Sequence, residues 1–256
     1  MSYHVVRGTW GLKDRLMNQR KAFTVPELLA VVAIIIIIIS MLLPALGKAK
    51  EHAKVSVCLS NQHQLAIAWR GYANENGSRI IGAHTARPNH DWVVNTAPPV
   101  NPANETEQAI RNGTLWPFIN DLDTYKCPSD PRGTYLRTYS MNNYVGGAGW
   151  YVSSVLRSGR FRQPSQTMVF IEEPDPRGYN WGSWVIYPKN HANASQWIDW
   201  AASYHYGKAC TLSFLDGRSE LWTWEDSRTP LIQSFYANHP GSKDLQRLQD
   251  VYNPGE

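Results

Sequence analysis

Cysteine is scarce in this sequence of 256 residues, and several familiar site signatures are missing. Its three cysteines, Cys58, Cys127 and Cys210, form no Cys-x-x-Cys pair, which argues against a structural zinc site. The spacing of an EF-hand calcium loop is absent. So is the Gly-x-Ser-x-Gly turn that carries the nucleophile of many hydrolases. No common sequence signature of a metal site or of a hydrolase therefore describes this chain.

Excess positive charge is confined to the front of the chain. The formal net charge is +4, but residues 1–22 hold five basic residues and one acidic residue, so the remainder sits near zero. The charged residues of this front segment are Arg7, Lys13, Asp14, Arg15, Arg20 and Lys21. A neutral remainder predicts no nucleic-acid partner. Basic residues before an apolar run follow the positive-inside rule and predict a cytoplasmic N-terminus.

Charge is also absent from a long apolar run. No residue from Leu28 to Gly47 is charged, and about 20 apolar residues are what a helix needs to cross a bilayer. Glu27 stands just before this run, where a carboxylate is costly and is usually kept for a partner or a function. The run is longer than the apolar core of a signal peptide. The segment is therefore predicted to stay in the inner membrane as a single span, with the rest of the chain in the periplasm or outside the cell.

The residues around the start of this run, Lys-Ala-Phe-Thr-Val-Pro-Glu-Leu-Leu (21–29), resemble the processing site of type IV prepilins and type II secretion pseudopilins. The resemblance implies that prepilin peptidase cuts after Ala22 and that the new N-terminal Phe23 is methylated. It also implies that Glu27, at the fifth position, keeps neighbouring subunits in register. This chain has Ala22 where the family usually has Gly, and Ala is the next smallest side chain. An unprocessed signal anchor is the alternative.

The same resemblance implies a pilin-like α+β fold, in which a long N-terminal helix packs on a small antiparallel β-sheet head. We expect a cleaved leader at residues 1–22, a transmembrane helix at 23–52, an amphipathic stem helix at 53–76 and a β-rich globular head at 77–256. The stem is indicated by apolar residues at three- and four-residue spacing from Val55 to Ala73, and Gly77 suits the end of that helix.

Several short segments of the head are predicted to be strands. Segments 139–144, 167–171 and 184–187 are predicted to be strands. Asp216-Gly217 between two alternating runs, 209–215 and 218–224, is a strong β-hairpin signal. A further short strand is expected at 92–94. Residues 226–256 carry many polar and turn residues and are expected to end loosely.

A second resemblance covers the C-terminal half. Cys-Leu-Ser-Asn-Gln (58–62), Tyr-Lys-Cys-Pro (125–128) and His205 before Asp216-Gly217 are similar to prepilin-like proteins of planctomycetes, verrucomicrobia and lentisphaerae. Their C-terminal module has a His, nine residues and then Asp-Gly, whereas ten residues intervene here. A hydrolase built from Ser203, His205 and Asp216 is the competing interpretation. We expect structural roles instead, with Asp216 serving the turn, and no enzymatic activity.

Two smaller hypotheses concern covalent and ionic links. In a compartment that permits disulfides, a Cys58–Cys127 bond would tie the stem to the head and leave Cys210 as a buried free thiol, although other pairings stay open. Carboxylates at Glu172, Glu173 and Asp175, in a loop after an apolar strand, are candidates for calcium because some major pseudopilins bind calcium in a C-terminal loop. A solvated acidic loop is the simpler account, so no cofactor is expected.

The leading functional hypothesis is a structural subunit of a pilus or pseudopilus. Its partners would be prepilin peptidase, other pilin or pseudopilin subunits and the inner membrane. The alternative is a membrane-tethered module that binds glycans outside the cytoplasm. That alternative predicts an exposed cleft of parallel rings, for which the candidates are Trp181, Trp184 and Trp197.

Overall fold

A computed structural model describes residues 23–85, 87–94, 106–147, 153–174 and 182–254 of the chain. The chain divides into two compact units, Met1–Gly47 and Lys48–Glu256, and we name the second the head unit. The layout is α+β, with a long apolar N-terminal helix and a small five-stranded sheet. The predicted leader, residues 1–22, lies outside the described residues.

One helix, α1 (Val25–Glu75), runs through both units. Residues 25–47, which we name the apolar segment, are exposed throughout. Among the described residues, one helix, α1, is long enough and apolar enough to cross a membrane. Its length and composition suit a membrane anchor or a signal sequence.

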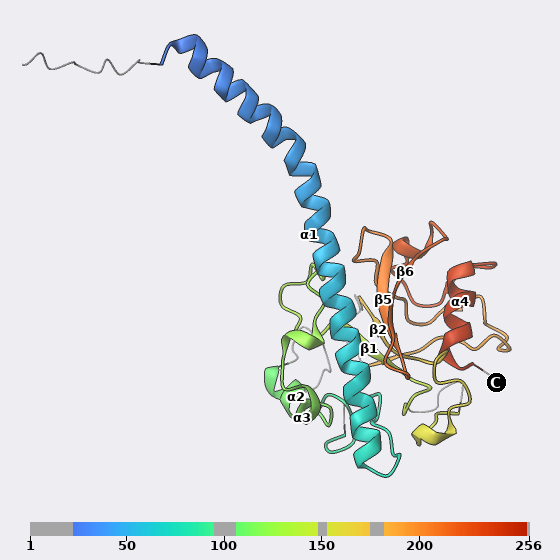
Figure 1. The fold of residues 1–256 in the computed structure, drawn as a ribbon. Helices are drawn as coiled ribbons and strands as arrows, with labels where there is room; N and C mark the ends of the chain where they lie inside the picture. Colours follow the sequence, from blue (N-terminus) through green and yellow to red (C-terminus); the bar gives the residue numbers. More distant parts are fainter. Residues whose placement is uncertain (1–22, 86, 95–105, 148–152, 175–181, 255–256) are drawn as a thin grey trace, which may run out of the picture. The chain divides into compact units, whose positions relative to one another are not determined.

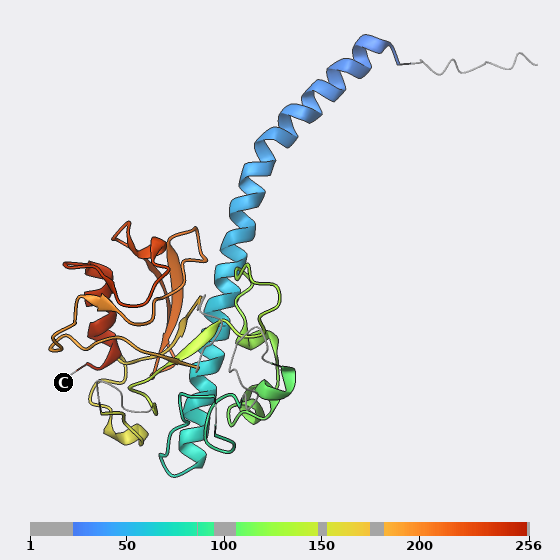
Figure 2. The same cartoon turned by 180° about the vertical axis from the view of Figure 1, so that it is seen from behind.

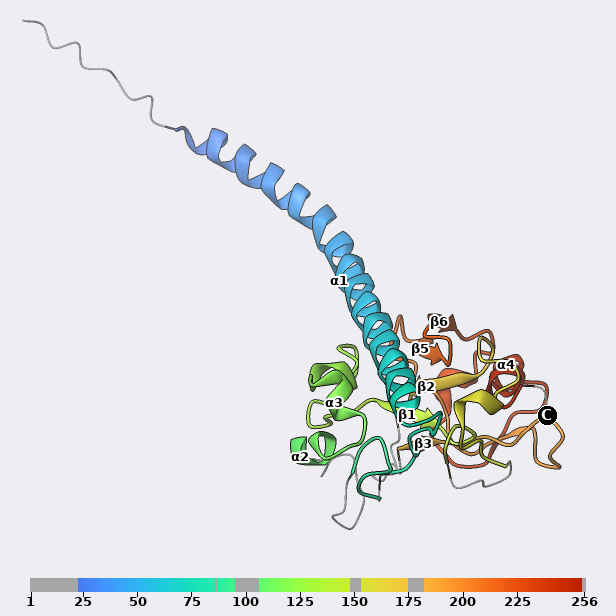
Figure 3. The same ribbon diagram turned by 60° about the horizontal axis from the view of Figure 1, so that its bottom comes forward.

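The remainder of α1, residues 48–75, is named the docked segment because one of its faces is buried in the head unit. Its buried residues recur at intervals of three and four, as an amphipathic helix requires. They are Val55, Cys58, Asn61, Gln62, Leu65, Ala66, Ala68, Trp69 and Ala73. Figures 1 to 3 place three elements on one side of the docked segment: β5 (Ala209–Phe214), β6 (Ser219–Thr223) and α4 (Lys243–Tyr252). They place α2 (Glu107–Arg111) and α3 (Trp116–Ile119) on the other side.

The main sheet has the strand order β3-β1-β2-β5-β6. Its strands are β1 (Tyr139–Asn142), β2 (Met168–Glu172), β3 (Ser183–Trp184), β5 (Ala209–Phe214) and β6 (Ser219–Thr223). The predicted strands at 139–144 and 167–171 and the predicted hairpin thus have counterparts. β1, β2 and β5 are buried along their whole length, although only β2 (Met-Val-Phe-Ile-Glu) is a nearly continuous apolar run.

The expectation of a purely antiparallel sheet is wrong, because β3 pairs with β1 in parallel. The other neighbours, β1 with β2, β2 with β5, and β5 with β6, are antiparallel. β3 lies beside β1 on the edge away from β2. It runs antiparallel to β2 and therefore parallel to β1. Only two residues of β3 make this pairing, fewer than the predicted segment 184–187.

Short elements surround this sheet. A second sheet pairs β4 (Gln196–Trp197) with β7 (Ala237–Asn238). The strand expected at 92–94 is not formed there; the chain instead makes an isolated bridge between Gly82 and Asp91. The remaining short helices are α2 (Glu107–Arg111), α3 (Trp116–Ile119), η2 (Asp123–Tyr125), η3 (Ser158–Arg160) and η4 (Thr229–Leu231).

Residues 243–252, within the segment expected to end loosely, form a helix. α4 (Lys243–Tyr252) begins at Ser242, whose hydroxyl accepts a hydrogen bond from the backbone N–H of Leu245. Leu245, Leu248 and Tyr252 are buried on one face of this helix. Because only these three apolar residues of the helix are buried and most of their neighbours are polar, the composition of this segment did not predict a helix.

Candidate functional site

The start of α1 places Glu27 in a capping box. The backbone N–H and the hydroxyl of Thr24 donate to Glu27 Oε2 at 2.9 and 2.8 Å, and the Glu27 N–H donates back to the Thr24 hydroxyl at 3.4 Å. Phe23 and Glu27 are both exposed in the isolated chain. Ala22 lies outside the described residues. Glu27 therefore has a local role at the helix start, in addition to any role between subunits.

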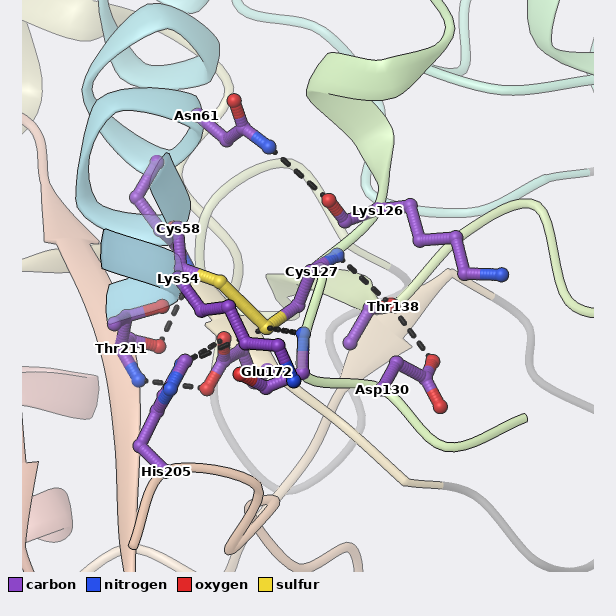
Figure 4. The surroundings of a disulfide bond; sticks show 12 residues. Lys54, Cys58, Asn61, Lys126, Cys127, Asp130, Thr138, Glu172, His205 and Thr211 are labelled. Carbon is purple, nitrogen blue, oxygen red and sulfur yellow. Dashed lines mark hydrogen bonds and ion pairs between the residues drawn. A yellow bond between two sulfur atoms is a disulfide. The ribbon is translucent and has the colours of Figure 1, made fainter. Parts of the chain in front are cut away.

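A disulfide joins Cys58 on the docked segment to Cys127 in the loop after η2. Their Cα atoms lie 5.3 Å apart across a sequence separation of 69 residues. Asn61, one turn further along α1, donates to the carbonyls of Asp123 and Lys126 at 3.1 and 3.0 Å, which holds the same loop (Figure 4). This is the pairing considered in the sequence analysis. Cys210 is a free, buried thiol, and burial raises its pKa well above the ordinary value.

His205 and Glu172 form a fully buried pair beside this disulfide (Figure 4). His205 Nε2 lies 3.0 Å from Glu172 Oε1 and 3.5 Å from Cys127 Sγ. The other carboxylate oxygen of Glu172 accepts the backbone N–H of Thr211 at 2.8 Å. On the opposite side of the imidazole, Nδ1 faces Glu51 Oε1 at 3.7 Å. The imidazole thus sits between two carboxylates and next to sulfur.

This geometry does not gather the residues of the competing hydrolase interpretation. His205 faces Glu172 and Cys127, whereas the Ser203 hydroxyl accepts a hydrogen bond from the Trp224 indole at 2.9 Å. Asp216 accepts the backbone N–H of Arg218 at 3.0 Å and so serves the hairpin turn. The three residues are near one another in sequence but contact different partners.

The Asp216-Gly217 turn docks on α1. Its carbonyls contact two side chains of the docked segment: Arg70 Nη1 donates to Asp216 O, and His63 Nδ1 lies against Gly217 O, both at 2.7 Å. Gly217 has a φ of +97°, a conformation that L side chains rarely adopt. The Asp-Gly signature thus closes the hairpin and fastens its tip to the helix.

Gln62 adds a second attachment, although the sequence analysis included it only in the amphipathic stripe and in the family-like segment 58–62. Its Nε2 donates to Thr211 O at 3.0 Å, and its Oε1 accepts the Ser213 hydroxyl at 3.0 Å. Glu51 was likewise not singled out. For Gln62 a signal was available, since it is an amide among the apolar positions of a helix. A buried amide usually has hydrogen-bond partners for its polar atoms, so this position could have been predicted to bind the head unit.

The calcium candidates are not arranged as an exposed acidic loop. Glu172 is the last residue of β2 and is fully buried, with its two oxygens directed to His205 and to Thr211. Glu173 is also buried. Asp175 lies outside the described residues. The prediction of a solvated loop at Glu172 is therefore wrong, because this carboxylate is used inside the fold.

Two of the three tryptophans named for a glycan cleft are in the core. Trp184 and Trp197 are both fully buried, so these two rings cannot form an exposed cleft. Trp181 lies outside the described residues. Trp184 packs edge-on against Tyr252 of α4 with ring centroids 6.0 Å apart. Aromatic residues here supply packing between the sheet and its covering helix.

Sequence comparison with family models and with curated proteins, and comparison with solved structures, finds no match to this chain.

Proposed function

We propose that this chain is a structural subunit of a type IV pilus or type II secretion pseudopilus, processed by prepilin peptidase. The observation that supports it is the division of α1 into two halves with opposite environments. The apolar segment is fully exposed in the single chain, whereas the docked segment has one face buried in the head unit. Exposed aliphatic surface of this extent needs burial by lipid or by equivalent helices.

Processing is the first point to test. In this proposal the peptidase removes residues 1–22 and Phe23 becomes a methylated N-terminus. Mass spectrometry of the full chain, co-expressed with a prepilin peptidase, is expected to find N-methyl-Phe23. An Ala22→Gly variant, which restores the residue usual in the family, serves as the positive control. A chain that still begins at Met1 while Ala22→Gly is cut would show that this site is not processed.

Assembly is the second point. In the proposal, the Glu27 carboxylate pairs with the N-terminal amine of a neighbouring subunit, where an unpaired charge in a low-dielectric setting is costly. Glu27 also caps its own helix, so the two roles have to be separated. Glu27→Gln keeps a side chain that can complete the capping box but removes the charge, whereas Glu27→Leu removes both.

Both variants are expected to insert in the membrane and to fail in assembly, measured by cross-linking between engineered cysteines in neighbouring apolar segments and by filament recovery. A Glu27→Gln chain that assembles like the native chain would refute the charge pair and leave only the capping role.

A further inference from the structure

The buried cluster beside the disulfide has the composition of a metal site. Cys58, Cys127, Glu172 and His205 each direct one ligand atom inward, and these four atoms lie within 4.8 Å of one another. All four residues are buried. They come from the docked segment, the loop after η2, the end of β2 and the bridge before β5, so no local sequence spacing reveals the set.

The His205 nitrogen and the Cys127 sulfur are separated as they would be around a tetrahedral zinc ion. With Zn–S near 2.3 Å and Zn–N and Zn–O near 2.0–2.1 Å, tetrahedral ligand atoms lie roughly 3.3–3.8 Å apart. His205 Nε2 lies 3.5 Å from Cys127 Sγ, inside this range, and 3.0 Å from Glu172 Oε1, slightly below it. The two sulfurs are bonded to each other and would have to separate to bind the ion. Two sulfurs, one imidazole nitrogen and one carboxylate oxygen form a set suited to zinc rather than to calcium or magnesium.

The surroundings also match those of a metal site. Glu172 Oε2 is fixed by the Thr211 N–H, and the Ser129 N–H points to Cys127 Sγ at 3.4 Å, which favours a thiolate. His205 Nδ1, on the far side of the ring, faces the Glu51 carboxylate at 3.7 Å. A carboxylate behind a ligating histidine is the usual outer partner in zinc sites, because it fixes the ring and raises its basicity. The Glu51 side chain is 24% exposed, which gives the cluster a route to solvent.

We propose that this cluster is a redox-gated zinc site, closed while Cys58 and Cys127 are bonded to each other and able to bind one zinc ion once they are reduced. A dithiol reductant would supply two electrons and two protons, turning the disulfide into two thiols and becoming a disulfide itself. Zinc then displaces both thiol protons and is held by two thiolates, His205 Nε2 and Glu172 Oε1. The disulfide links two of these segments, the docked segment and the loop after η2, whereas the metal would link all four.

The test uses the full chain in detergent, prepared in two forms under anaerobic conditions. One is left oxidised. The other is reduced with a phosphine, which becomes a phosphine oxide with oxygen from water while the disulfide gains two electrons and two protons. Zinc chloride is then titrated against a chromogenic chelator. We expect one zinc ion per reduced chain and none per oxidised chain. This comparison needs no variant, so it does not depend on whether a mutant folds.

Variants and cobalt then identify the ligands. His205→Ala should weaken zinc binding more than about 100-fold, because loss of an outer partner alone costs about 10–100-fold. Cys210→Ala is the matched control and should bind like the native chain. Cobalt in the reduced chain should give thiolate charge-transfer and tetrahedral ligand-field bands, which Cys58→Ser weakens. The proposal is overturned if the reduced chain takes no zinc, if the oxidised chain takes as much, or if His205→Ala binds equally well.

Discussion

The Cys58–Cys127 bond should account for a large part of the stability of the head unit. It closes a loop across 69 residues, and both sulfurs are buried. Loop-closure entropy for a loop of this size corresponds to about 4 kcal/mol at 25 °C. We therefore expect the Cys58→Ala/Cys127→Ala chain to lose about 4 kcal/mol of unfolding free energy, plus about 1 kcal/mol for the two missing sulfur atoms.

Urea unfolding in detergent, followed by tryptophan fluorescence, measures this loss because Trp69, Trp92 and Trp184 are buried in the head unit. With an m-value near 2 kcal/mol per M of urea, a 4 kcal/mol loss lowers the midpoint by about 2 M. Cys210→Ala removes a buried sulfur without breaking a cross-link and measures the packing term alone. The experiments are run with a chelator so that metal does not contribute. If the double variant differs from Cys210→Ala by less than about 1 kcal/mol, the cross-link does not restrain the unfolded chain as this reasoning requires.

Three further predictions use the same unfolding assay. Gly217→Ala should destabilise the head unit by about 1–2 kcal/mol because its φ is +97°, whereas Gly159→Ala, which has open space and no positive φ, should change little; equal effects would refute the strain argument. Gln62→Leu should cost about 1–3 kcal/mol, because it leaves two buried β5 groups without their partner, and a neutral result would contradict the attachment described here. Burial alone would raise the pKa of Asp91, but hydrogen bonds from Arg87 and His90 outweigh it and lower that pKa below its ordinary 3.8. The stability that this carboxylate contributes is therefore complete above pH 3.8 and is lost as the pH falls through the lower pKa of the folded state. The difference in urea midpoint between the native chain and Asp91→Asn should therefore shrink from about pH 6 to pH 3. A difference that stays constant over this range would refute the argument.

The elements that the sequence predicts best are those with strong local signals. α1 follows from one uncharged run continued by an amphipathic stripe, and the β5–β6 hairpin follows from Asp216-Gly217 between alternating runs. Local patterns of this kind depend on backbone conformation and burial, which neighbouring residues largely decide.

What the sequence did not predict depends on contacts between distant segments. The parallel pairing of β3 with β1 involves two residues on each strand, too few to leave a periodic pattern. Glu172 is predicted in a loop because it follows an apolar strand, whereas it ends β2 and its partners are 33 and 39 residues away in sequence. The Cys-Cys-His-Glu cluster was missed for the same reason, since its members share a place only after the sheet and α1 have come together.

The docked segment has a practical consequence for any soluble form of this protein. Removing α1 at residue 77, where a predicted head begins, would strip Cys58, Leu65 and Trp69 from the core and leave β5 without the Gln62 amide. The helix is one wall of the folded core, so a chain lacking it has no complete interior to bury. A truncation between Gly47 and Lys48 would instead remove only residues of the first compact unit and keep the docked segment whole.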